Sequence, residues 1–98
     1  MGEPYIINPD TLTHVNPAEI FGKDAKRLLR ACNNAFENWL SEGKCDCEEW
    51  ERNRDRQFRI IYGVARRHGA YVEWHGTESP GQWTIHKHDE IIAHIYCL

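Results

Sequence analysis

Apolar residues recur every three or four positions through the first two thirds of the chain, a spacing that gathers them on one side of an α-helix. Asn16 and Pro17 predict a helix start, because asparagine caps free N–H groups and proline needs none in the first turn. Gly43 interrupts the pattern and predicts a helix end. We therefore expect helices at 17–42 and 46–68, joined by a link short enough for an antiparallel hairpin.

The second helical segment separates its residues by charge around the helix axis. At about 100° per residue, five arginines fall within an arc of roughly 100°, opposite the large apolar side chains. The arginines are Arg52, Arg56, Arg59, Arg66 and Arg67, and the apolar side carries Trp50, Phe58, Ile61 and Ala65. Arg54 is an exception that falls in phase with the apolar side, so we expect it to emerge at the helix–sheet boundary or to pair with a carboxylate.

From residue 70 the apolar period changes to two, which predicts β-strands at 70–75, 82–87 and 91–97. Their spacing predicts an antiparallel meander. Residues 91–97 also fit a short helix, because Ile91, Ile92 and Ile95 match helical spacing. The β-branched and aromatic residues of this segment favour the strand.

The chain therefore reads as one α+β domain, an antiparallel helical hairpin packed on a three-stranded antiparallel β-meander. Its segments are an extended arm at 1–15, which forms an edge strand or packs across the domain, the helical hairpin at 16–69 and the meander at 70–98. The predicted core contains Phe21, Leu28, Leu29, Cys32, Phe36, Trp39, Phe58, Ile61, Ala65, Val72, Trp74, Trp83, Ile85 and Ile95.

Composition supports one small folded domain, since 41% of the 98 residues are hydrophobic. A core of this size cannot hide four tryptophans, so we expect at least one to be partly exposed. The net charge of −3 argues against a chain built to coat nucleic acid. No apolar run reaches the ~18 residues of a membrane span, and no secretory leader begins the sequence, so we expect a cytoplasmic protein.

The arginine-rich helix face has two interpretations. It is either a solvated surface stabilised by pairs such as Glu48–Arg52 and Asp55–Arg59, or a contact surface for a partner. Gly63 favours the second, because a glycine in a helix interior costs ~1 kcal/mol relative to alanine and permits close approach by another backbone. That backbone belongs either to the arm of this chain or to a partner. The first helix adds a basic face with Lys23, Arg27 and Arg30.

Histidines and cysteines provide two candidate metal sites. The predicted strands place His75, His86 and His94 on the sheet face away from the core, where a three-histidine zinc site has a suitable geometry. Cys45 and Cys47 form a CxC pair, but structural zinc sites use CxxC-like spacing with a second matching pair. Neither pattern dictates chelation, so we expect neither a metal nor another cofactor.

No phosphate-binding loop, nucleophile elbow or recognisable acid–base pair occurs in the sequence, so we expect no enzymatic activity. We interpret the chain as a small binding protein, an inhibitor or modulator that docks on a larger protein with an acidic or nucleic-acid-mimicking surface. A short chain with many aromatic residues and weak motifs is also typical of phage and mobile-element accessory proteins that counter host defences. The alternatives are a nucleic-acid-binding module that uses the same arginines and a small zinc-binding protein.

Overall fold

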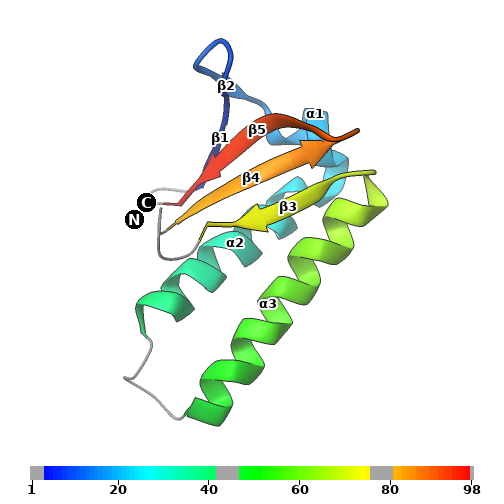
Figure 1. Ribbon diagram of the computed structural model, residues 1–98. Coiled ribbons are helices and arrows are strands. Elements are labelled where there is room, and N and C mark those ends of the chain that lie inside the picture. The colour runs from blue at the N-terminus through cyan, green and yellow to red at the C-terminus, as the bar shows by residue number, and fades with distance from the viewer. Residues whose placement is uncertain (1–3, 42–46, 76–80, 98) are drawn as a thin grey trace.

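The structure is a computed structural model that describes residues 4–41, 47–75 and 81–97. Five antiparallel strands form one sheet in the order β2-β1-β5-β4-β3, and the long helices α2 and α3 lie on one face of it (Figure 1). In chain order the elements are β1 (Tyr5–Asn8), β2 (Thr13–Val15), α1 (Pro17–Phe21), the 3-10 turn η1 (Gly22–Asp24), α2 (Ala25–Leu40), α3 (Cys47–Arg67), β3 (Tyr71–Trp74), β4 (Gln82–Lys87) and β5 (Glu90–Tyr96). The α+β class predicted from the sequence is confirmed.

The predicted three-stranded meander is wrong, because the N-terminal arm adds two strands to it. Ile6 of β1 is only 1% exposed and pairs with Ile95 of β5, so burial of this apolar side chain fixes β1 in the sheet. The chain then reverses at Asn8, whose side-chain oxygen accepts a hydrogen bond from the Asp10 N–H at 2.8 Å. Pro4 and the proline after Asn8 flank the strand rather than interrupt it. The arm therefore forms a strand pair at the sheet edge.

The predicted helix at 17–42 is divided in the structure. Asn16 caps α1 as expected, accepting a hydrogen bond from the Ala18 N–H at 3.1 Å. The helix ends after five residues, because Gly22 takes a φ of +54° that a regular helix does not accommodate. The chain passes through η1 before α2 begins at Ala25. A glycine with positive φ thus separates two helices that share one apolar period.

Helices α2 and α3 lie side by side and run in opposite directions (Figure 1). Near the end of α2, Asn38 contacts Trp50 in the first turns of α3, and Asp24 before α2 contacts His68 after α3. The link between the helices, with the predicted helix stop at Gly43, lies at 42–46, outside the described residues.

The third predicted strand is confirmed as β5, and the helical alternative for 91–97 is wrong. The side chains of Ala93 and Ile95 are buried while those of the residues between and beside them are less so, which is the period of a strand. A register irregularity between Ile85 and His86 shifts the pairing of β5 with β4. This bulge explains why Ile91 and Ile92 fall out of strict alternation.

Most of the predicted core is confirmed. Phe21, Leu28, Cys32, Ile61, Ala65, Val72, Trp83, Ile85 and Ile95 are buried, and Leu29, Phe36, Phe58 and Trp74 pack partly buried against them. Trp39 is less central than expected, since it lies partly exposed with its ring 6.4 Å from that of Trp74. The expectation of a partly exposed tryptophan is met by Trp39, Trp50 and Trp74. In the described part of the chain no helix has the length and apolar character needed to cross a membrane.

Candidate functional site

The five arginines predicted to share one face of α3 are all exposed. The buried side of the helix consists of Gln57, Ile61, Val64 and Ala65, which lie roughly opposite in helical phase. Packing against α2 and the sheet thus fixes the orientation of the helix and directs the arginines to solvent. We call Arg52, Arg56, Arg59, Arg66 and Arg67 the arginine face.

The ion pair suggested between Asp55 and Arg59 is absent from the described residues. Asp55 pairs with Arg54, at 3.2 Å between the Arg54 Nε and an Asp55 carboxylate oxygen, and not with Arg59. Across residues 4–41, 47–75 and 81–97, no carboxylate lies within salt-bridge distance of any of the five arginines.

Arg54, the exception in the apolar phase, is explained by a second contact. Its guanidinium carbon lies 5.2 Å from the centre of the Trp50 ring, a cation–π geometry, while Asp55 holds its Nε. The expected pairing of Arg54 with a carboxylate is therefore confirmed, and its side chain remains partly exposed.

Gly63 lies in the middle of the arginine face with open space above it. A Cβ built at this position would meet no atom within 4 Å. The glycine is therefore not explained by a close contact with the described part of its own chain, including the N-terminal strands. Of the two reasons considered for Gly63, the structure excludes close contact with the described part of the arm, residues 4–15.

Part of the arginine face is concave. A groove of about 440 Å³ lies where α2 ends and α3 begins, and Arg52 and Arg56 contribute to its rim. It is lined by Asn38, Glu49, Trp50, Arg52, Asn53 and Arg56. Guanidinium and amide N–H groups in one groove are suited to a carboxylate or a phosphate.

A network of neutral hydrogen bonds supports this groove. Asn38, which is only 8% exposed, donates to the Trp50 carbonyl at 3.3 Å and accepts from the Asn53 side chain at 2.9 Å. The Trp50 indole N–H donates to the Asn38 carbonyl, and the Gln57 amide donates to Asn53 at 3.2 Å. Sequence reasoning missed Asn38, Asn53 and Gln57. The sequence could have indicated these residues, because an amide side chain that falls within an apolar helical stripe is buried and requires a hydrogen-bond partner.

The basic residues of the first helical segment divide into two groups. Lys23, Arg27 and Arg30 are all exposed. Arg27 lies eleven residues before Asn38, about three full turns, and therefore borders the side of α2 that contacts α3. Lys23 instead lines a separate groove beside β1 and β2, apart from the groove that Arg52 and Arg56 line.

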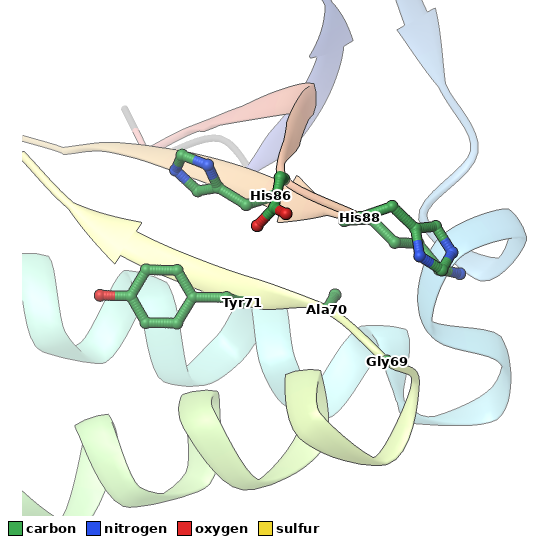
Figure 2. Close-up of a pocket in the computed structure, with 7 residues that line it drawn as sticks. Gly69, Ala70, Tyr71, His86 and His88 are labelled. Atoms are coloured by element: carbon green, nitrogen blue, oxygen red, sulfur yellow. The ribbon is translucent and has the colours of Figure 1, made fainter.

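The histidines occupy the uncovered face of the sheet, as the strand pattern predicted. His86 pairs with Tyr71 in register, with 5.7 Å between their rings, and Figure 2 shows the two side chains next to each other. The Gln82 amide donates to His94 Nδ1 at 2.7 Å, and His75 is hydrogen bonded to Thr84. Partial burial lowers the pKa of His94, and the nearby His75 and His86 lower it further. His75 and His94 thus have hydrogen-bond partners within the sheet, whereas the Nε2 of His86 is buried without one in the described part of the chain.

A hollow of about 500 Å³ at the end of β3 and β4 also contains two histidines. In Figure 2, His86 and His88 point to opposite sides, so their imidazoles do not converge on one point. Among the residues that the structure describes, no group of three His, Cys, Asp or Glu side chains is placed to hold a metal ion.

The cysteines show no sign of reactivity or of metal binding in the described regions. Cys32 and Cys97 are buried, and burial raises the pKa of both thiols, that of Cys97 to about 11. Cys47 is exposed at the start of α3. Its predicted partner Cys45 lies outside the described residues.

The chain matches no family model, no curated protein and no solved structure, so the site must be interpreted from its own geometry.

Proposed function

We propose that this chain is a non-enzymatic binding protein that docks on an acidic surface of a larger protein through the arginine face of α3, and so inhibits or modulates it. One observation carries the proposal: five exposed arginines lie on one helix face, and none has an ion pair in the described chain. Their guanidiniums are rigid, permanently charged donors that match carboxylates in pairs.

The groove beside the arginine face gives the proposed partner a point of entry. Arg52 and Arg56 lie at its rim, and the indole of Trp50 provides apolar contact area. Arginine and tryptophan are enriched at the energetic centres of protein interfaces. An aspartate or glutamate side chain that enters the groove would meet two guanidiniums, with Glu49 as the opposing charge that any such partner must tolerate.

The distribution of charge supports a local contact with protein. The whole chain carries a net charge of −3, so the basic surface is a patch on an acidic molecule. Long-range attraction to the nucleic-acid backbone is weak for such a molecule. Nucleic-acid binding through the same arginines is therefore the alternative function, and it has a distinct signature in salt dependence.

Charge reversal tests the surface. The double variant Arg56→Glu/Arg59→Glu changes two exposed positions and preserves the buried side of α3. Immobilised wild-type protein should capture one stoichiometric partner, and the variant should lose that capture by about a hundredfold or more. The control is Lys26→Glu/Lys87→Glu, which makes the same change of charge elsewhere and should capture normally. Equal capture by both variants would show that the arginine face is not the docking surface.

A titration with short DNA and RNA, duplex and single-stranded, separates the two functions. Micromolar binding that falls steeply between about 50 and 200 mM salt would favour the nucleic-acid alternative. The protein-binding proposal predicts no such binding at low salt.

A further inference from the structure

A second groove, which shares no lining residue with the arginine face, lies between β1, β2, α1 and the start of α2. The strands β1 and β2 lie at one edge of the sheet and β3 at the other (Figure 1), whereas the start of α2 lies near the end of α3, where Asp24 accepts a hydrogen bond from His68. The groove has a volume of about 480 Å³, within the range of small-molecule sites.

The inner surface of this groove is apolar. Ile6 and Ala25, both buried members of the core, belong to its lining, together with the partly buried side chains of Val15, Leu29 and Tyr5. The groove exists because α1 ends at Gly22, where the positive φ turns the chain before α2 begins. A long apolar chain that entered here would remove these side chains from water.

Among the described residues that line this groove, the formal charges have a single sign. Lys23 and Lys26 line it and are exposed, and neither has an ion pair among the described residues. No carboxylate of the described chain lines the groove. Asp24 lies between Lys23 and Lys26 in the sequence. It accepts a hydrogen bond from His68 at 3.0 Å. The two exposed lysines favour an anionic group over a neutral or cationic one, and the charge of Lys23 also acts on the neighbouring Asp24 carboxylate.

We propose that this groove binds an amphiphilic carboxylate, a small molecule with an unbranched hydrophobic chain and one anionic head group. The chain would lie against Ile6, Val15 and Leu29, and the carboxylate would meet Lys23 and Lys26. Lysine suits this role, since its ammonium is a compact point charge that does not demand the planar pairing arginine prefers. The inference is independent of the arginine face, because the two surfaces share no residue.

Calorimetric titration of the full-length chain with octanoate, decanoate and dodecanoate tests the apolar part. Affinity should rise by up to about fourfold for each added methylene until the groove is filled. Methyl signals of Ile6, Val15 and Leu29 should shift in an NMR spectrum as decanoate is added. Absence of binding at about 1 mM decanoate, or shifts confined to other methyl groups, would overturn the proposal.

Two comparisons test the charged part. Decyltrimethylammonium has a matched chain with a cationic head, and it should bind at least about tenfold more weakly than decanoate. In the variant Lys23→Gln/Lys26→Gln that preference should disappear, whereas Lys87→Gln, a lysine outside the groove, should retain it. Equal affinity for the two amphiphiles in the wild-type chain, or an unchanged preference in the double variant, would contradict the role of the lysines. Because both lysines are exposed, the circular dichroism and unfolding midpoint of the double variant should match those of the wild type.

Discussion

The two ends of the helix pair are held together by different chemistry. Where α2 ends and α3 begins, the contacts are neutral, with Asn38 hydrogen bonded to Trp50 and Asn53. At the opposite end the contact is ionisable. His68 donates to the Asp24 carboxylate at 3.0 Å, and its ring meets that of Phe21 edge-on at 6.1 Å.

This difference shows at which end of the helix pair the contacts do not depend on pH. The groove of the arginine face lies at the neutral end, where amide hydrogen bonds do not titrate. Arginine itself remains charged throughout the physiological range. The hydrogen bonds that support Arg52 and Arg56 therefore do not titrate, whereas the Asp24–His68 end, where Arg67 acts on Asp24, contains groups that do. Four changes, taken from the largest expected effect to the smallest, test this contrast.

Asn38→Ala should produce the largest effect. It removes the hydrogen bonds of the buried amide to the Trp50 carbonyl and the Asn53 side chain, and it leaves the Asn53 side-chain N–H without this acceptor. We expect the free energy of unfolding, measured in urea, to fall by about 2–3 kcal/mol. Asn34→Ala is the matched control on the same helix, since Asn34 has no such network, and it should change stability by about 0.5 kcal/mol or less. Similar losses for the two variants would contradict the role of the neutral network.

Much of the architecture could be predicted from sequence, because it depends on periodicity. The buried stripe of α3 and the alternating burial of β5 both follow patterns that extend over several turns or residue pairs. For the arm the sequence left an edge strand as one of two alternatives. The pair of strands β1 and β2 did not follow from it, because both are short and because proline suggests interruption even when it only flanks a strand. Their place depends on Ile6 meeting Ile95 from the other end of the chain, which local patterns do not encode.

The candidate site could be predicted only in part. Exposure of the arginines followed from helical phase, because any residue opposite a buried stripe faces solvent. The concave groove did not follow, since it depends on Asn38 of α2 meeting Trp50 and Asn53 of α3. Lys23 was grouped with Arg27 because both are basic and close in sequence, but the turn at Gly22 directs Lys23 to another surface.

Trp50→Phe removes one hydrogen bond, that of the indole N–H, from the contacts where α2 ends and α3 begins. The indole N–H donates to the Asn38 carbonyl, but that carbonyl also accepts from the Ser41 hydroxyl at 2.8 Å. Loss of the indole donor therefore leaves no buried acceptor unpaired. We expect a loss of about 1 kcal/mol in the free energy of unfolding, clearly less than for Asn38→Ala. A loss as large as that of Asn38→Ala would mean that the ring, rather than the amide, holds this end together.

Gly63→Ala changes the arginine face within α3, away from the contacts at both ends of the helix pair. Because the new methyl group meets nothing within 4 Å, the higher helix propensity of alanine should raise the free energy of unfolding by about 0.5–1 kcal/mol. If a partner approaches the helix backbone here, capture of that partner should weaken in the same variant. Urea denaturation and capture by the immobilised chain measure the two effects separately. A variant with unchanged capture would show that the partner does not need the glycine.

Asp24→Asn should produce the smallest effect, and one that depends on pH. The hydrogen bond from His68 holds the pKa of Asp24 below its usual value of 3.8; partial burial opposes this shift, and the positive charges of Arg67, His68 and Lys23 add to it. A carboxylate with a lowered folded-state pKa stabilises the fold above its unfolded-state pKa and loses that contribution as the pH falls through the folded-state value. The wild type should therefore be more stable than Asp24→Asn at about pH 5, and the difference should shrink towards about pH 2. The exposed control Asp10→Asn should show little difference at either pH, and the Asn38→Ala deficit should stay constant between them. A deficit for Asp24→Asn that does not change with pH would show that this end of the helix pair, like the other, is held without charge.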